Sequence, residues 1–201
     1  MKRLGILTIL LLLLWSGCGK QENPWKGVDA NKAVPAGDPP FTRLTTSWVI
    51  DNAHILGPET IQAGDAICQR LKQDGIAEMV VIVQNGVKHP EDYATHYGRW
   101  LGLGRATAAT EGGQNGLVWL IRPDADLKMT YSRGRGLPWF TSADAAGIMD
   151  KAKDFLDFSN YDKGVALIIQ ETDKNLRAKD TKKEGAKRAG WESVAPWFSR
   201  C

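Results

Sequence analysis

The chain has 201 residues, of which 43% are hydrophobic and 24% are charged, and its formal net charge at pH 7 is +3. This length suits one domain with its own hydrophobic core. The net charge is too small for the strongly basic character of nucleic-acid-binding proteins, so we expect no nucleic-acid partner.

The first 17 residues have the composition of an export signal. Lys2 and Arg3 precede an apolar stretch over residues 4–15, which is shorter than the ~20 residues that a transmembrane helix needs. The run Trp15-Ser16-Gly17-Cys18 resembles the bacterial lipobox, whose cysteine is lipidated on its sulfur. Trp15 replaces the usual aliphatic residue, and the alternative is an ordinary signal peptide that is cut nearby. We predict a signal peptide over residues 1–17, lipidation of Cys18, and an exported protein of the cell envelope, on the periplasmic face if the cell is Gram-negative.

A tether is predicted between this anchor and the folded domain. Cleavage before Cys18 would remove 17 of the 201 residues and leave 184, and the loss of Lys2 and Arg3 would lower the net charge from +3 to +1. Residues 18–43 are polar and contain four prolines, so they bury too little apolar surface to offset the entropy of ordering. One acyl chain binds a membrane only marginally, but the several chains of a bacterial lipoprotein would hold this tether stably. The folded domain is predicted over residues 44–178.

Two helices and two strands are expected before residue 122. Each helix opens at a proline in its first turn and closes at a glycine. Each strand is a continuous apolar run, as in a sheet that is covered on both faces. In chain order these elements are the helix from Pro58 to Gly75, the strand 79–83, the helix from Pro90 to Gly102 or Gly104, and the strand 117–121.

A hairpin and two more helices are expected in the rest of the domain. Residues 122–126 supply the turn, and a half-exposed strand follows in which apolar and polar residues alternate. Thr141 or Ser142 is predicted to cap the next helix, and Asp162 the last one. Helices that alternate with apolar strands predict an α/β fold, with one mixed sheet covered by helices on both faces.

Residues 179–201 form a basic C-terminal tail that contains tryptophan. Its cations are expected at a solvated helix end, because positive charge favours the C-terminal end of the helix dipole. Its aromatic residues include Trp191, Trp197 and Phe198. Such residues are costly to leave in water, so we expect them to dock on the domain or to contact a partner or a membrane interface.

Two further cysteines, Cys68 and Cys201, remain in the mature chain. Exported proteins can form disulfides, so these two could pair. Cys68 also lies on the apolar side of a predicted helix, where a buried free thiol is equally natural. Both alternatives stay open.

Most catalytic signatures are missing from the sequence. It contains no HExxH pair, no G-x-S-x-G elbow and no EF-hand loop, and the three histidines, which lack the spacing of metal ligands, are expected at the surface or at helix ends. Three polar loops remain as candidate sites. They are Asp51-Asn52 at the end of a strand-like run, the run GGQNG at 112–116 before an apolar strand, and the run SRGRG at 132–136 after the hairpin strand.

These loops belong to a series of short motifs whose order and spacing resemble the TPM domain family, named for thylakoid-lumen phosphatase-like and related proteins. The series runs from Val49 to Leu176 and includes VIDNAHIL, YATHYGRWLGLG, NGLVWLI and RGRGL. The resemblance implies a three-layer α/β/α sandwich with a mixed central sheet and a shallow site at the strand ends. It also implies membrane-tethered modules, some of which bind calcium or other divalent ions, and acid phosphatase activity in some plant members.

The resemblance assigns roles to five polar residues. Asp51 matches the acidic residue of the family's first motif, and Asn115 the asparagine of its central motif, where the family commonly has an aspartate in the place of Gln114. These three would be the metal ligands, placed side by side by the glycine run, and calcium or magnesium would bind weakly because an amide replaces a carboxylate. Arg133 and Arg135 suit phosphate or another anion, with a solvated turn as the alternative.

Two functions remain at this stage. The first is a non-catalytic envelope lipoprotein whose domain binds a membrane or envelope protein, or helps to assemble or maintain a membrane complex. The second is a divalent-metal-dependent acid phosphatase, in which the ion would polarise the phosphoryl oxygen of a phosphomonoester. The sequence offers no identifiable general base or nucleophile for the second.

Overall fold

The structure is a computed structural model that describes residues 46–104 and 114–194, with side chains in the second stretch up to residue 180. Its elements in chain order are β1 (Val49–Asp51), α1 (Pro58–Gln73), β2 (Glu78–Val83), α2 (Pro90–Leu101), β3 (Gly116–Ile121), β4 (Met129–Arg133), α3 (Ser142–Asp157) and α4 (Tyr161–Val194). The predicted signal peptide, Cys18, the tether, Cys201 and residues 112 and 113 of the glycine run lie outside the described residues. Within the described stretches, no helix combines the length and the apolar character needed to cross a bilayer.

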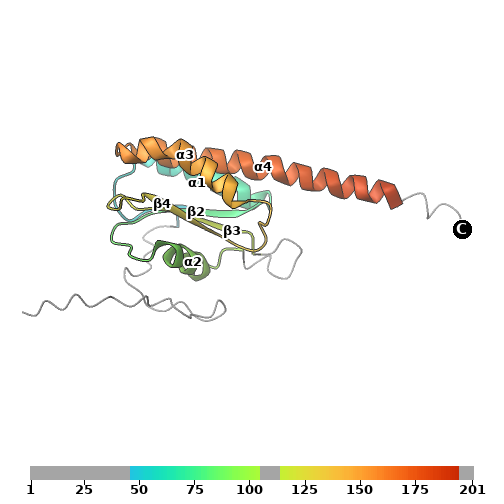
Figure 1. The fold of residues 1–201 in the computed structure, drawn as a ribbon, viewed down its shortest axis with the longest axis horizontal. Helices are drawn as coiled ribbons and strands as arrows, with labels where there is room; N and C mark the ends of the chain where they lie inside the picture. The colour runs from blue at the N-terminus through green and yellow to red at the C-terminus, as the bar shows by residue number, and fades with distance from the viewer. Residues whose placement is uncertain (1–45, 105–113, 195–201) are drawn as a thin grey trace, which may run out of the picture.

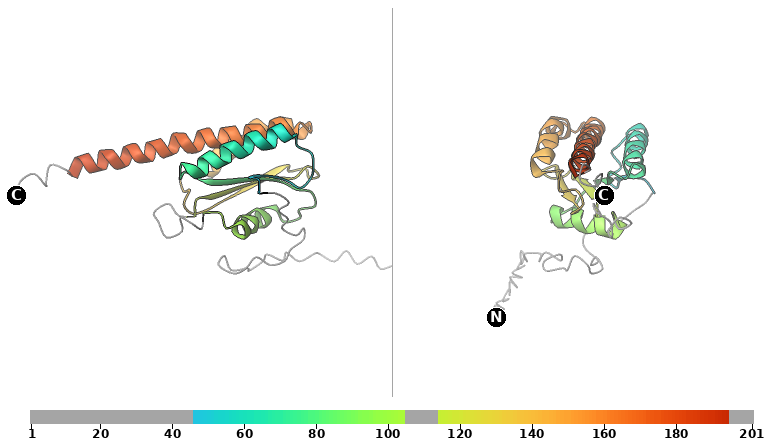
Figure 2. Two further views of the ribbon diagram at one scale, coloured as in Figure 1. Left: turned by 180° about the vertical axis from the view of Figure 1, so that it is seen from behind. Right: turned by 90° about the vertical axis from the view of Figure 1, so that its right-hand side faces the viewer.

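The four strands form one mixed sheet in the order β1-β2-β3-β4. The first three strands run parallel, and β4 pairs antiparallel with β3. α1, α3 and α4 cover one face of the sheet and α2 covers the other (Figures 1 and 2). The predicted α/β/α sandwich with a mixed central sheet is therefore confirmed.

The two parallel crossovers of this sheet have opposite hands. The connections from β1 to β2 and from β2 to β3 each step one strand in the same direction, yet their helices α1 and α2 lie on opposite faces (Figure 2). About 98% of such crossovers in proteins are right-handed, so one of these two is an exception. This arrangement covers both faces of a sheet whose strand order never reverses.

Side chains that alternate along the central strands divide between two cores. Val81 and Trp119 pack with residues of α1, α3 and α4, whereas Val80 and Val118 pack with α2. Trp119 is fully buried, and its indole Nε1 donates to Oγ1 of Thr172 in α4 at 3.1 Å. The two apolar runs therefore form strands that are covered on both faces, as predicted.

The helix starts agree with the sequence signals for three helices. Proline occupies the first turn of both α1 and α2, and the Thr141 side chain caps α3 in a reciprocal capping box with Asp144. α2 closes at Gly102, whose φ of 71° lies in the left-handed region that glycine adopts without strain. The prediction that Asp162 caps α4 is wrong, since Asp162 lies in the first turn of that helix and its Oδ1 accepts from the Gly57 amide of the α1 N-cap at 2.8 Å.

α4 is much longer than the other helices and extends past the rest of the domain (Figure 1). It has 34 residues, which corresponds to about 50 Å of helix. It begins beside the ends of β1, β2 and β3 and continues without a break through the domain boundary that we predicted after residue 178. The C-terminal end of α4 therefore lies at the far end of the molecule from its start.

Candidate functional site

The expected metal ligands lie at opposite ends of the sheet. Asp51 is the last residue of β1 and aligns with Val83 and Ile121, the last residues of β2 and β3. Asn115 precedes β3 instead, so it lies at the ends where the parallel strands begin. Five residue steps along β3 separate these two ends by about 17 Å. The prediction that Gln114 and Asn115 lie beside Asp51 is therefore wrong, because parallel strands place a residue that follows one strand far from a residue that precedes the next.

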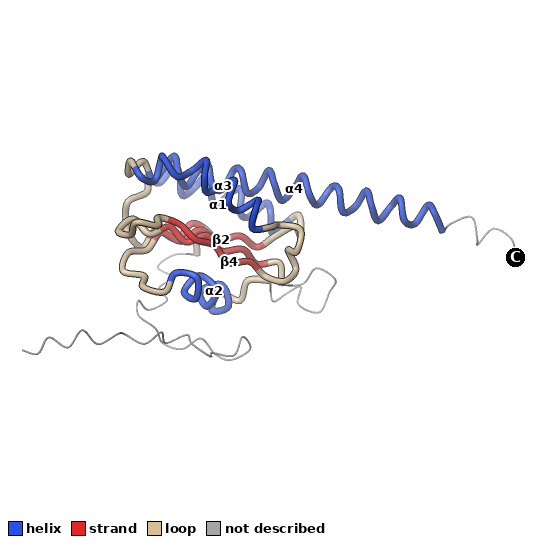
Figure 3. The backbone as a smooth tube through the Cα atoms, viewed as in Figure 1, coloured by secondary structure: helices blue, strands red, loops and turns tan. Residues whose placement is uncertain are grey.

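Two loop clusters result from this separation (Figure 3). We call the side where β1, β2 and β3 end the carboxyl end, and the opposite side the amino end. The carboxyl end carries Asp51 and the loops at 52–57, 84–89 and 122–128. The amino end carries residues 114–115 and the loop 134–141, and it therefore holds four of the five predicted site residues, namely Gln114, Asn115, Arg133 and Arg135.

At the carboxyl end, Asp51 organises the loop between β1 and α1. Its Oδ2 accepts hydrogen bonds from the amides of Ile55 and Leu56, both at 2.8 Å. This loop also contains His54 in the left-handed region, with φ at 56°. The other carboxylate oxygen, Oδ1, is buried and has no hydrogen-bond partner among the described residues. Asp51 thus stabilises the turn through Oδ2, and its Oδ1 is not used in this role.

Other polar groups at the carboxyl end connect neighbouring loops. Asn52 donates through Nδ2 to Oε1 of Gln84 at 2.7 Å, and Gln84 donates through Nε2 to the carbonyl of Asn85 at 3.0 Å. Asp124 Oδ2 accepts from the Gly86 amide at 2.8 Å. These side chains stabilise the loop conformations rather than converge on one point.

Arg122, in the segment predicted as a turn, is a buried cation at the carboxyl end. Its side chain donates from Nη1 to the carbonyl of Val87 at 3.3 Å and from Nη2 to that of Leu127 at 2.5 Å. Burial lowers the pKa of the guanidinium, although the negative charge of Asp124 opposes this effect. Arg122 therefore joins two loops through their backbone, and the only sequence signal for this role is its position directly after a buried strand.

At the amino end, the glycines permit two backbone segments to touch. The Gly134 amide donates to Gly116 O at 2.7 Å, and the Gly136 amide to Gln114 O at 3.2 Å. A Cβ atom on Gly134 would lie 1.7 Å from the Gln114 carbonyl oxygen, so no other residue fits there. Gln114 itself has a φ of 63°. Gln114 and Gly116 therefore contact the segment that carries Arg133 and Arg135.

Asn115 and Glu78 stabilise the start of the central strands. Asn115 is buried, and its side-chain Nδ2 donates to Ile76 O at 3.4 Å. Its backbone carbonyl accepts from the Glu78 amide at 3.1 Å. The Glu78 carboxylate is also buried and accepts from the Gly104 amide at 3.1 Å. The Asn115 amide group therefore has a structural contact in place of the predicted ligand position beside Asp51.

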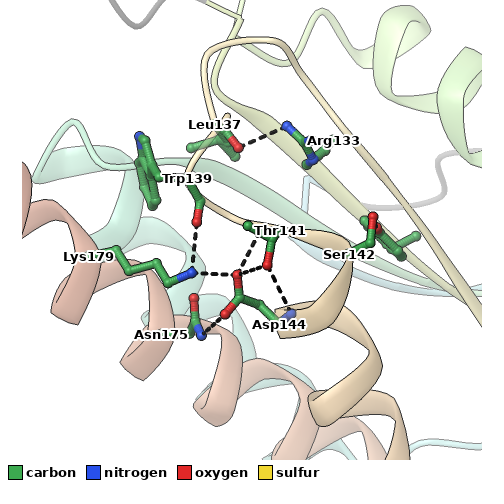
Figure 4. A network of polar contacts seen from close by, with 9 residues as sticks. Arg133, Leu137, Trp139, Thr141, Ser142, Asp144, Asn175 and Lys179 are labelled. Carbon is green, nitrogen blue, oxygen red and sulfur yellow. Dashed lines mark hydrogen bonds and ion pairs between the residues drawn. The ribbon is translucent and has the colours of Figure 1, made fainter.

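A polar network at the amino end joins α3 to α4 (Figure 4). Asp144 Oδ2 accepts from Lys179 Nζ at 2.5 Å and from the amide and hydroxyl of Thr141 at 2.6 Å each, and its Oδ1 accepts from Asn175 at 3.0 Å. Burial alone would raise the pKa of Asp144, but the hydrogen bonds from Lys179, Thr141 and Asn175 outweigh it and hold that pKa well below its usual range. Lys179 Nζ also donates to Trp139 O at 2.8 Å. No sequence pattern predicted this network.

The two predicted anion-binding arginines lie beside this network but are not part of it. Arg133 and Arg135 are both exposed at the end of β4, and Arg133 Nη1 donates to Leu137 O at 3.0 Å (Figure 4). This contact stabilises the turn after β4. The two arginines lie at the end of the sheet opposite Asp51. One phosphate group is only a few ångströms across, so it could not contact an arginine and Asp51 at the same time.

The remaining titratable groups in the described part of the chain do not gather into a metal site. Among the described residues, no three His, Cys, Asp or Glu side chains lie close enough to hold a metal ion together. Cys68 is buried and forms no disulfide within the described residues, and burial, followed by the charges of Asp65 and Asp173, raises the pKa of its thiol to about 12. Cys201 lies outside the described residues, so its pairing with Cys68 stays a prediction. The expectation of surface or helix-end positions for His54, His89 and His96 is wrong for His96, which is buried within α2.

The sequence matches a known domain family, and the fold is similar to solved structures. A model of the TPM domain matches residues 49–175. The N-terminal domain of a P. gingivalis protein, solved by NMR, is similar in fold, with a TM-score of 0.58, 19% identity, and coverage of 67% of this chain and 84% of that one. A Corynebacterium glutamicum N-terminal domain gives a TM-score of 0.47 at 14% identity, covering 73% of this chain and 88% of that one. No curated protein matches the sequence.

Proposed function

The chain belongs to the TPM domain family, and from that premise we propose that it is an envelope lipoprotein whose TPM domain is a binding module for the assembly or maintenance of a membrane complex. A lipid on Cys18 would hold the exported domain at a membrane, on the periplasmic side in a Gram-negative cell. Its partner would be a membrane or envelope protein. The sequence of residues 1–18 motivates the anchor, and the polar residues 18–43 motivate the tether.

One observation supports a binding role over a catalytic one. The residues expected to form a metal and phosphate centre are divided between the carboxyl and amino ends of the sheet, about 17 Å apart. At each end, polar side chains bond to backbone groups of the loops, as Arg122 and Arg133 do. These contacts stabilise loop shape, which is what a recognition surface needs.

The alternative function, a divalent-metal-dependent acid phosphatase, has one observation in its favour. The buried Oδ1 of Asp51 lacks a hydrogen-bond partner among the described residues, and a carboxylate oxygen is a ligand that calcium and magnesium prefer. However, calcium takes six to eight oxygen ligands, and the other two predicted ligands, Gln114 and Asn115, lie at the far end of the sheet. The predicted ligand set therefore does not fit a single ion.

Fractionation of cells that express the full-length chain tests the proposal, with Cys18→Ser as the matched control. We expect the unaltered protein in the membrane fraction, crosslinked to an envelope protein, and the Cys18→Ser protein to be released from the membrane. Recovery of both proteins in the same fraction would contradict the lipid anchor.

A second assay on the purified protein separates binding from catalysis. Calcium or magnesium at a hundred times its Kd would stabilise the fold by ~2.7 kcal/mol, which thermal melting detects. Under the binding proposal we expect no such shift and no phosphomonoester hydrolysis. Turnover that Asp51→Asn abolishes would replace the binding proposal with the phosphatase.

A further inference from the structure

Exposed hydrophobic side chains concentrate at the carboxyl end of the sheet. Four large hydrophobic residues are exposed among the described side chains, and three of them lie in loops at this end: Ile55 at 36%, Leu127 at 60% and Phe158 at 84% exposure. The fourth, Trp100 at 45%, lies on α2. Single exposed apolar residues are ordinary on protein surfaces, but three at one end of a small domain indicate an interaction surface.

The three loops that carry these residues are joined by hydrogen bonds. The Gly57 amide, two residues after Ile55, donates to Asp162 Oδ1 at 2.8 Å, and the Tyr161 hydroxyl donates to Pro123 O at 3.4 Å. Two of the three non-glycine residues with positive φ in the described chain, His54 and Ser159, directly adjoin Ile55 and Phe158. Unusual backbone conformations of this kind tend to occur at functional surfaces. We call the three segments 51–59, 122–128 and 157–163 the carboxyl-end patch.

The carboxyl-end patch has a net negative charge. Its three segments contain six Asp or Glu residues and three Lys or Arg residues. Two of the cations have contacts that keep them within the loops, since Arg122 is buried and Lys128 Nζ donates to Pro123 O at 2.6 Å. One of the acidic residues, Asp157, is ion-paired with Lys153. An acidic rim disfavours an anionic membrane surface and favours a protein segment that combines aromatic residues with positive charge.

The chain itself carries such a segment at its C-terminus. Residues 182–201 contain five Lys or Arg residues and two Asp or Glu residues, together with Trp191, Trp197 and Phe198. Their net positive charge complements the net negative charge of the carboxyl-end patch. Tryptophan is also the residue type most enriched among the residues that dominate binding energy at protein interfaces.

The segment cannot reach the patch of its own molecule. α4 starts beside the carboxyl-end patch, and its 34 residues carry the chain about 50 Å away (Figure 1). The seven residues that follow Val194 span at most about 25 Å when fully extended. Contact between this segment and the patch therefore requires two molecules.

We propose that the carboxyl-end patch, through Phe158, Leu127 and Ile55, binds the basic aromatic segment 182–201 of a second copy of this chain. This inference rests on the binding role proposed above and names the partner as another copy held on the same membrane. Such a contact joins different surfaces of the two copies, so repetition produces a ring or an open chain of molecules. The small apolar area predicts weak association that depends on high local concentration at the membrane.

A titration with a peptide tests the contact. The probe is a labelled peptide of residues 182–201 with Cys201→Ser, added to the dilute mature protein and followed by fluorescence anisotropy. We expect saturable binding that weakens at least tenfold in Phe158→Ser and in Leu127→Ser, and at least threefold in Asp126→Lys. Trp100→Ser is the matched control, since it removes an exposed hydrophobic residue from α2, and it should change the affinity less than twofold. Circular dichroism verifies that each variant is folded.

Three results would overturn the inference. The first is that the peptide does not bind at millimolar concentration. The second is that the peptide binds equally to the unaltered protein and to Phe158→Ser. The third is that no peptide binds while Phe158→Ser loses binding to phosphatidylglycerol vesicles, which would identify the patch as a membrane contact. Crosslinking to a different envelope protein that persists in Phe158→Ser would leave the binding role intact while removing the second copy as the partner. Failure of the membrane fractionation described above would contradict the lipid anchor, whereas the peptide titration tests the contact between the two surfaces directly.

Discussion

Lys179 in α4 donates a hydrogen bond of 2.5 Å to Asp144 in the first turn of α3, 35 residues earlier in the chain. The same carboxylate caps α3 through Thr141 and accepts from Asn175 of α4. One aspartate thus both begins one helix and positions another against it. The stability of this part of the domain should depend strongly on Asp144.

Asp144→Ala is expected to destabilise the fold by about 2–3 kcal/mol, because it removes the helix cap and leaves Lys179 and Asn175 without their acceptor. Urea denaturation at pH 7 measures the change. Asp154→Ala, on the exposed surface of the same helix, is the control and should cost less than about 0.5 kcal/mol. Equal effects of the two substitutions would show that the network contributes little.

The low pKa of Asp144 predicts how this contribution depends on pH. A carboxylate whose folded pKa lies below its unfolded value of 3.8 binds fewer protons in the folded state, so its contribution is present above that unfolded value and is lost as the pH falls below it. The stability difference between the unaltered protein and Asp144→Asn should therefore be largest at neutral pH and should shrink below about pH 4. A difference that stays constant down to pH 2 would contradict the assignment.

His96 predicts a second, separate pH dependence near neutrality. Burial, followed by the charge of Arg99, lowers its pKa from the ordinary value of 6.5, against the opposing charge of Asp92. A histidine with a lowered folded pKa favours folding when neutral, so stability should fall as the pH drops below about 6.5. The decrease between pH 7 and pH 5 should be smaller in His96→Gln, measured by thermal melting at both pH values. The same decrease in both proteins would assign it to other groups.

Gly134→Ala should be among the most damaging small substitutions in the domain. The added Cβ would lie 1.7 Å from the Gln114 carbonyl oxygen, a backbone atom that cannot move without displacing β3. We expect a loss of about 3 kcal/mol or more, or failure to fold. Gly147→Ala is the control, because nothing lies within 4 Å of its added Cβ, and there alanine should stabilise α3 by about 0.5–1 kcal/mol.

Substitutions of Asp51 separate its structural role from any role in ion binding. Asp51→Ala removes the acceptor for the amides of Ile55 and Leu56 and should cost about 1–2 kcal/mol, whereas Asp51→Asn retains an acceptor and should cost less than about 1 kcal/mol. Urea denaturation with and without calcium distinguishes the two roles. Calcium-dependent stability that both substitutions remove would assign an ion to this carboxylate.

Local sequence signals predicted most of the fold. Proline in the first turn located the starts of α1 and α2, the apolar runs located β2 and β3, and Thr141 was correctly named as a candidate cap for α3. These features depend on a few neighbouring residues, so they can be read from the chain directly. The opposite hands of the two crossovers cannot be read in this way, because they depend on which face of the sheet each helix covers.

The candidate site was predicted less well because it depends on strand direction and on distant partners. Asp51 ends a strand whereas Asn115 precedes one, and in a parallel sheet this order alone places them at opposite ends. Arg122 bonds to backbone carbonyls, which carry no sequence signal. Asp144 and Lys179 are 35 residues apart, with nothing in either local pattern to relate them.

The length of α4 also gives the molecule a mechanical property. Fifteen residues of the helix follow Lys179 up to Val194. They correspond to about 22 Å of helix beyond the contact of Lys179 with the domain. A tilt of this part of the helix by about 10° at Lys179 would displace the C-terminal end of α4 by about 4 Å. The contact between Asp144 and Lys179 is therefore one of the contacts that set the direction of this distal part of α4.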